Sequence, residues 1–120
     1  MIVVEGKRDV QRVRTLVPGV MVVATNGWPS QTRLMALKRI ARGRRVVLLT
    51  DADRAGRKIR ALLREVFPDS IDIYVRRSFN GVEHTPWLYL ARSLERAGVL
   101  EAALSDEIIT SKGERRNGKR

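Results

Sequence analysis

The sequence predicts an α/β fold with a mainly parallel sheet of about four strands and helices on both faces. Short β-branched runs alternate along the chain with longer stretches whose apolar residues recur at helical spacing. The strand-like runs are apolar almost throughout, which is typical of strands buried on both faces of a parallel sheet. Strands that alternate with helices indicate β-α-β units, and these build a sheet covered on both sides.

In the first half of the chain, strands are expected over residues 2–5 and 20–25, with a helix over 8–17 between them. The helix carries apolar residues at helical spacing, and Pro18-Gly19 ends it. Ser30 is the expected N-cap of a second helix over 31–41, because a serine hydroxyl can accept from the free N–H groups of the first turn. Gly43 follows that helix and stops it.

In the second half, the most apolar strand is expected over residues 46–50 and a fourth over 71–75. The amphipathic helix between them, 55–67, is predicted to point Arg60 and Arg64 outward. Thr85 is the predicted cap of a helix that begins at Pro86, places Trp87 in the core and closes at Gly98. A short helix over 100–109 completes a domain of residues 1–109. The basic tail, 110–120, is expected to be disordered.

Composition favours a cytoplasmic protein that binds a polyanion. The chain has 120 residues, 24 Lys and Arg against 13 acids, and a formal charge of +11. Such a balance attracts phosphate backbones, although arginine-rich helix faces can also be simply solvated. The absence of cysteine excludes a disulfide scaffold and thiolate metal sites. No apolar run reaches the roughly 18 residues of a membrane span, and the strand-like start does not resemble a secretory signal.

Three acids in this basic chain are predicted to converge. Glu5 ends the first strand, and Asp51 and Asp53 directly follow the third. Because the carboxyl ends of parallel strands lie at one edge of the sheet, these side chains are expected to meet there. Carboxylate oxygens suit Mg²⁺ or Mn²⁺, and Glu5 can share the metal or act as a base beside it. Capping and turn chemistry at the strand ends is the alternative interpretation of all three acids.

Cations and turn residues surround these acids in the sequence. Nucleic-acid contacts are assigned as hypotheses to Lys7, Asn26, Gly27, Arg54, Arg57 and Lys58. Each of these residues also has a simpler interpretation. Asn26 and Gly27 are natural in a turn that needs positive φ, and Lys7 can be a solvated turn residue. The three cations after Asp53 can form ion pairs with the acids. Trp28, in the same turn, can stack on an unpaired base. Gly6 and Gly56 are interpreted as structural glycines of the site, Gly56 letting a helix start close to a ligand.

Glu5-Gly6 after one strand, followed by Asp51, Asp53 and Gly56 after another, resembles the Toprim domain, a Rossmann-like module of topoisomerases, primases, recombination proteins and nucleases. The resemblance covers roughly residues 1–75. In that family the glutamate is assigned to acid/base work and the aspartates to Mg²⁺, which implies these roles for Glu5 and for Asp51 and Asp53. Topoisomerases and primases need further domains that have no room in this chain.

The chain also resembles small stand-alone Toprim proteins and, more closely, the Toprim ribonuclease that matures 5S ribosomal RNA. The matching segments are 3–7, 25–27, 50–53 and 81–84, the last of which contains Glu83 and His84. That ribonuclease carries a further C-terminal domain without a counterpart here, so the catalytic core is expected and the 5S substrate stays open. The expected function is Mg²⁺-dependent phosphodiester cleavage of structured RNA, with recognition helped by a protein partner. A nucleic-acid-binding module without catalysis and a DNA-processing accessory are the alternatives.

Overall fold

The computed structural model describes residues 1–75, 81–82 and 85–99. Strands and helices alternate along the chain, and each begins and ends within two residues of its expected place. The elements are β1 (Ile2–Val4), α1 (Lys7–Leu16), β2 (Val22–Ala24), α2 (Gln31–Ile40), β3 (Val47–Thr50), α3 (Arg54–Val66), β4 (Ile71–Tyr74) and α4 (Trp87–Arg96). Glu83, His84, the expected helix over 100–109 and the tail lie outside the described residues, so the predicted domain boundary stays a prediction.

The four strands form one sheet in the order β2-β1-β3-β4, and every neighbouring pair is parallel. This confirms the predicted Rossmann-like α/β class. Strand β1 lies between β2 and β3, with Ile2 opposite both Val22 and Val47. Because all strands run the same way, the residues that follow β1, β2 and β3 emerge at one edge of the sheet, the carboxyl edge.

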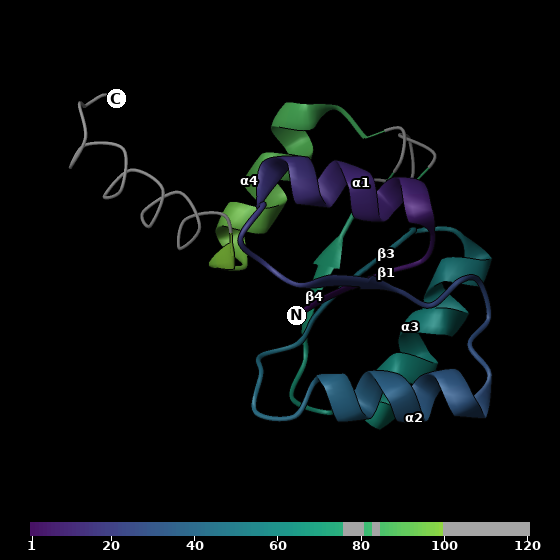
Figure 1. Ribbon diagram of the computed structural model, residues 1–120. Coiled ribbons are helices and arrows are strands. Elements are labelled where there is room, and N and C mark those ends of the chain that lie inside the picture. Colours follow the sequence, from purple (N-terminus) through teal and green to yellow (C-terminus); the bar gives the residue numbers. More distant parts are fainter. Residues whose placement is uncertain (76–80, 83–84, 100–120) are drawn as a thin grey trace.

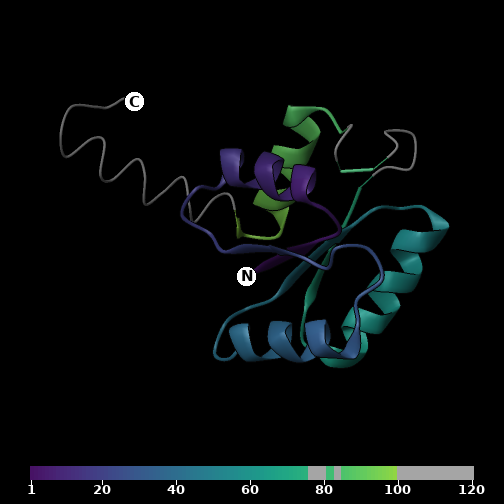
Figure 2. The same cartoon turned by 45° about the vertical axis from the view of Figure 1, so that its right-hand side comes forward.

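Helices cover both faces of this sheet, α1 and α4 on one side and α2 and α3 on the other (Figure 1). The strand pleat divides the core accordingly. Ile2 and Val4 pack with Val13 of α1 and Leu90 of α4, whereas Val3 packs between the opposite pair of helices. The turned view in Figure 2 shows the same layers, with α2 and α3 below the strands. The two-sided burial explains why the strand sequences are apolar at nearly every position.

The predicted N-cap residue is confirmed for α2 and wrong for α4. The Ser30 hydroxyl accepts a 3.1 Å hydrogen bond from the N–H of Arg33, as an N-cap should. Thr85 does not cap α4. Its hydroxyl donates instead to the carbonyl of Gly81 at 2.7 Å, and the cap position is taken by Pro86. The hydroxyl thus stabilises the loop before α4 rather than the helix.

Two side chains lie where the helical periodicity did not place them. Arg60, predicted to face solvent, is buried with 5% of its surface exposed. Trp87, predicted to lie in the core, is 47% exposed, and the guanidinium carbon of Arg12 lies 4.2 Å from the centre of its ring. The cation–π contact between α1 and α4 gives Trp87 a partner outside the core.

Within the described residues, no helix combines the length and the apolar character that crossing a bilayer requires.

Candidate metal and nucleic-acid site

The carboxyl edge brings Glu5 and Asp51 into direct contact. β1 and β3 are neighbours, so the residue after each strand emerges beside the other. The Glu5 carboxylate accepts a 2.6 Å hydrogen bond from the backbone N–H of Asp51 through its Oε2 atom. The short contact ties together two residues that are 46 positions apart in the chain. Glu5 is therefore oriented by the residue with which it was predicted to share a site.

The Glu5 carboxyl has a raised pKa. Burial is the largest cause, because removing the carboxylate from water disfavours its charged form. The negative charges of Asp51, Asp53 and Asp9 raise the pKa further, while the hydrogen bond from the Asp51 N–H opposes the shift. Four carboxyl groups thus interact at one edge of a strongly basic chain. A perturbed carboxyl in such a cluster is a feature of functional sites.

The two aspartates after β3 make different local contacts. Asp51 accepts a 2.8 Å hydrogen bond through Oδ1 from the backbone N–H of Val82. Asp53 is the N-cap of α3 and accepts a 2.7 Å bond through Oδ1 from the N–H of Gly56. In the part of the chain that the structure describes, no three acid or histidine side chains form a ready-made ligand set. The capping interpretation holds for Asp53, and the assignment of metal to the three acids stays a prediction.

Glycines let the backbone approach Asp51 from two sides. A Cβ at Gly56 would lie 2.1 Å from the Asp51 carbonyl oxygen, so α3 can start here only without a side chain. At Gly81, where φ is +97°, a Cβ would lie 2.8 Å from Asp51 Oδ1. Gly6 differs, because a Cβ there would meet nothing closer than 3.8 Å. Close packing against backbone therefore requires glycine at Gly56, and positive φ together with the Asp51 carboxylate favours it at Gly81, whereas neither reason applies at Gly6.

The turn after β2 is attached to Glu5. Asn26 and Gly27 both have positive φ, 61° and 81°, and both backbone N–H groups donate to the Glu5 carbonyl, at 3.0 and 3.2 Å. The prediction that Asn26 and Gly27 form a turn with positive φ is therefore confirmed. The same turn presents Trp28 with 63% of its surface exposed. A large aromatic side chain is therefore held in water one residue beyond the backbone that is bonded to Glu5.

All four cations predicted to contact nucleic acid are exposed at this edge: Lys7 at the start of α1, and Arg54, Arg57 and Lys58 in the first turns of α3. Among the described residues, none of the three in α3 forms a hydrogen bond or ion pair with an acid through its side chain. The ion-pair alternative for these residues therefore finds no support in the described part of the structure. Their charges are available to an external anion.

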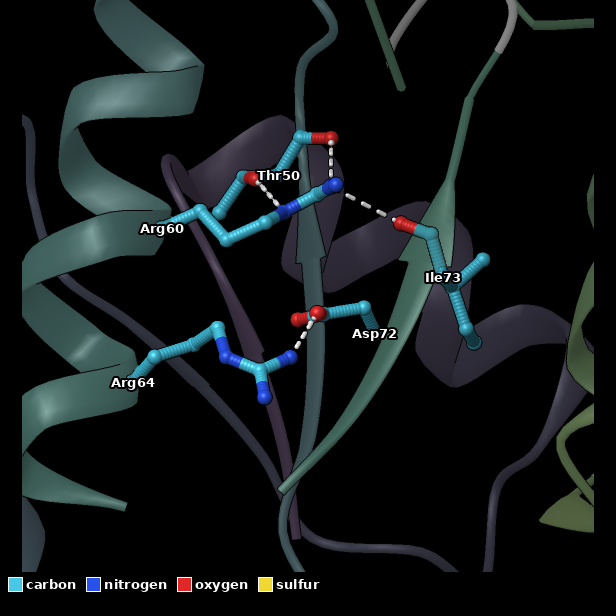
Figure 3. Close-up of polar contacts among 5 residues, drawn as sticks. All are labelled: Thr50, Arg60, Arg64, Asp72 and Ile73. Atoms are coloured by element: carbon cyan, nitrogen blue, oxygen red, sulfur yellow. Dashed lines mark hydrogen bonds and ion pairs between the residues drawn. The ribbon is translucent and has the colours of Figure 1, made fainter. Parts of the chain in front are cut away.

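Arg60, which the sequence pattern placed in solvent, joins the ends of β3 and β4 behind the acids. Its Nε donates to the Thr50 hydroxyl at 2.9 Å, and its Nη2 donates to the carbonyls of Thr50 at 3.1 Å and Ile73 at 2.9 Å (Figure 3). Thr50 directly precedes Asp51, so this buried network fixes the backbone that carries the aspartate. A threonine at the end of a buried strand is the one sequence signal for it.

Two more residues, Asp9 and Arg12, support the site. Asp9, in the first turn of α1, is buried and accepts a 3.1 Å bond from the N–H of Gly6. Arg12 donates to the carbonyl of Val82 at 2.9 Å, which helps to hold the loop that contacts Asp51. The Asp9 contact is local, because Gly6 is the N-cap of α1 and Asp9 is the third residue of that helix. The Arg12 contact depends on how separate segments pack, since Val82 lies 70 positions further along the chain.

A parallel four-stranded sheet with a glutamate after β1 and an aspartate pair after β3 defines a class of nucleic-acid-associated α/β domains. The model of the Toprim domain matches residues 1–81, and the chain belongs to this family. Toprim domains are linked in general to nucleic acid and typically bind Mg²⁺. Membership therefore connects the chain to a metal-dependent, nucleic-acid-related role at the level of the family.

Two relatives share most of the chain. A small TOPRIM domain protein from Bacillus stearothermophilus, of known structure, is 41% identical, with a TM-score of 0.73 over 80% of this chain and 82% of its own. The uncharacterized protein YusF of Bacillus subtilis (strain 168) is 32% identical over 100 residues, which span 82% of this chain and 68% of YusF. The predicted likeness to small stand-alone Toprim proteins is confirmed, and the likeness to the 5S-maturing ribonuclease stays a prediction.

Proposed function

We propose that this protein cleaves phosphodiester bonds in nucleic acid with the help of Mg²⁺ or Mn²⁺, and that structured RNA is its substrate. The observation that carries this proposal is the Glu5 carboxyl, bonded to the N–H of Asp51 and raised in pKa among three further acids. Acids gathered in a protein of charge +11 suit metal-assisted work on a polyanion. The cations would bind the substrate and the acids would act on it.

The donor set fits a hard divalent cation. Asp51 and Asp53, with Glu5 beside them, would hold the metal through carboxylate oxygens, which Mg²⁺ prefers. The negative charges that raise the pKa of Glu5 are the charges that a bound cation would offset. A metal in such a site supplies Lewis-acid polarisation of a phosphoryl oxygen and neutralises charge that develops there.

The chain's own residues would perform the remaining tasks. A glutamate whose pKa is raised is better suited to accept a proton from an attacking water than an ordinary one. Lys7, Arg54 and Arg57 are exposed on the same edge and would position the phosphates that flank the cut. Asn26 and Gly27 would offer side-chain and backbone contacts from the neighbouring turn, and Lys58 would add charge from α3.

RNA is favoured over DNA because an exposed aromatic residue in the turn bonded to Glu5 suits unpaired bases. Single-stranded loops, bulges and ends present bases that can stack on an aromatic ring. Trp28 lies on the turn that is bonded to the Glu5 carbonyl, so a base stacked there would place its nucleotide near the acids. The predicted kinship with the 5S-maturing ribonuclease points the same way. A protein partner would supply the recognition of a particular RNA.

A nucleic-acid-binding module without catalysis is the second candidate, and one observation favours it. Asp51 Oδ1 is bonded to Val82 and Asp53 Oδ1 to Gly56, so part of each carboxylate already has a backbone partner. A protein of this kind would use its basic surface to retain RNA within a larger assembly. Its acids would then be structural.

The deciding experiment incubates purified protein with labelled structured RNA in Mg²⁺ or in EDTA. The proposal expects shortened RNA with Mg²⁺ alone, and a loss of rate by orders of magnitude in Asp51→Asn. The control is Glu95→Gln, which removes an equal charge from an exposed position of α4. RNA retention by Asp51→Asn should stay within about twofold of wild type, because cations supply the affinity. RNA that is retarded but never shortened would establish the binding module instead.

A further inference from the structure

A second basic feature lies at the opposite edge of the sheet from the acids. Where α2 and α3 end and β3 and β4 begin, the surface forms a hollow of about 330 Å³. Its back is apolar and includes Ala41, Val46 and Phe67. Its lining carries four cations, Lys38, Arg42, Arg44 and Arg45, against one acid, Asp69. A strand of four residues separates this edge from Asp51, a length of about 13 Å at 3.3 Å per residue.

Two cations of this hollow are held in place by backbone carbonyls, and none of the four forms an ion pair within the described residues. Arg44 donates through Nε to the carbonyl of Ile40 at 3.2 Å, and Arg45 donates through Nη2 to the carbonyl of Ala97 at 3.0 Å. These carbonyls belong to the ends of α2 and α4, so they anchor the side chains but bear no full charge. Within the described residues, Lys38 and Arg42 form no ion pair and no side-chain hydrogen bond. An external anion would offset these positive charges.

The positive surface continues from the hollow along α2. A second hollow, of about 490 Å³, is lined by Met35, Lys38, Arg39 and Arg42, and it shares two of these residues with the first. Lys38 and Arg39 lie in the last turn of α2, where cations interact favourably with the helix dipole. The helix dipole explains the charge of these two residues but does not explain why they line two adjoining hollows. A helix of ten residues is about 15 Å long, enough for several successive phosphates of a nucleic-acid strand.

We infer that these two hollows, which we call the α2 strip, bind the phosphodiester backbone of a nucleic-acid strand. A run of cations over adjoining hollows suits a chain of phosphates better than one free nucleotide, and the apolar back can pack against a sugar or base. The choice of nucleic acid as the ligand rests on the proposed function. The strip lies at the edge opposite the acids, so the substrate must be long enough to reach both edges of the sheet.

The test compares two charge reversals in binding assays without metal, where no cleavage interferes. Lys38→Glu with Arg42→Glu reverses two cations four residues apart on the α2 strip. The matched control, Arg92→Glu with Arg96→Glu, makes the same change of charge at the same spacing on exposed positions of α4, across the sheet. The probe is a fluorescent single-stranded RNA of 20 nucleotides, titrated at several salt concentrations in EDTA, with ADP as a competitor.

The strip variant should bind the RNA at least about tenfold more weakly at 100 mM salt, and the slope of log affinity against log salt should fall by about 1–2. The control should change affinity by less than about threefold. Equal losses in both variants would overturn the inference, because net charge alone would then explain them. Displacement of the RNA by ADP at micromolar concentration would also overturn it in favour of a nucleotide pocket. If the wild type binds through the strip but never cleaves with Mg²⁺, the proposed function fails and the strip stands.

Discussion

The guanidinium of Arg60 donates hydrogen bonds to both the side-chain hydroxyl and the backbone carbonyl of Thr50, at 2.9 and 3.1 Å. Thr50 is the last residue of β3, and Asp51 follows it. A third bond, to the carbonyl of Ile73, extends the network to β4. The position of Asp51 therefore depends on a buried cation contributed by α3. A rigid arrangement of this kind is what a metal-binding or catalytic carboxylate needs.

Replacing Arg60 by Met should destabilise the fold by about 3 kcal/mol, because it removes charge-assisted hydrogen bonds and leaves buried acceptors without a donor. The matched control is Arg64→Met, one turn further along α3. Arg64 is half-exposed and pairs with Asp72, whose side chain is 9% exposed (Figure 3), so its loss should cost less than that of Arg60, about 1–2 kcal/mol. Urea unfolding of both variants measures the difference. Equal costs would show that the Arg60 network contributes little.

Gly81→Ala should destabilise the fold by about 2–3 kcal/mol. The substitution combines the cost of a positive φ with a Cβ only 2.8 Å from Asp51 Oδ1. Gly98→Ala is the control, since its φ is +79° but its nearest neighbour would be 3.6 Å away. The excess cost of Gly81→Ala in denaturant unfolding reports the crowding at Asp51. The two variants should be indistinguishable if Asp51 can turn aside freely.

Glu5→Gln should raise the melting temperature at neutral pH in the absence of metal. The folded-state pKa of Glu5 is raised, mainly by burial, so its ionisation opposes folding. The stability that the protonated carboxyl contributes is present below the ordinary glutamate pKa and is lost as the pH rises through the raised pKa. The amide stays neutral and its oxygen can still accept from the Asp51 N–H.

Melting curves between pH 3.5 and 8 measure this effect, with the exposed Glu95→Gln as a flat control. The advantage of Glu5→Gln should shrink to nothing at the acid end of the range. Added Mg²⁺ should stabilise the wild type more than Glu5→Gln, because a cation that binds the folded state raises its stability. A constant difference at all pH values would contradict the burial of a titrating Glu5.

Single-stranded RNA should quench the fluorescence of Trp28. The chain has two tryptophans, so Trp87→Phe leaves Trp28 as the sole reporter and Trp28→Phe is the matched control. Quenching should persist in the first variant and largely disappear in the second, because Trp28 follows the turn that is bonded to Glu5 and Trp87 lies against Arg12. Trp28→Ala should weaken binding about tenfold through the loss of one stacked base. Unchanged affinity would remove Trp28 from the substrate site.

The sequence by itself determined the alternation of strands and helices, the parallel sheet and the edge at which Glu5 and Asp51 meet. These follow from patterns that are local: apolar runs for buried strands, helical spacing, and a serine such as Ser30 before a helix. The chirality and parallel pairing of β-α-β units then place the residues after β1 and β3 side by side without any knowledge of side-chain contacts.

Only the tertiary structure decided how those residues are used. Helical periodicity gives Arg60 an outward direction, yet carbonyls from two strands provide enough hydrogen bonds to bury it. Asp51 binds the N–H of Val82, and Trp87 contacts Arg12, through pairings that bridge distant segments. The α2 strip likewise forms where two helix ends and two strand starts come together. Such contacts depend on how segments far apart in the sequence pack together, whereas helical periodicity describes only residues that are close in the sequence.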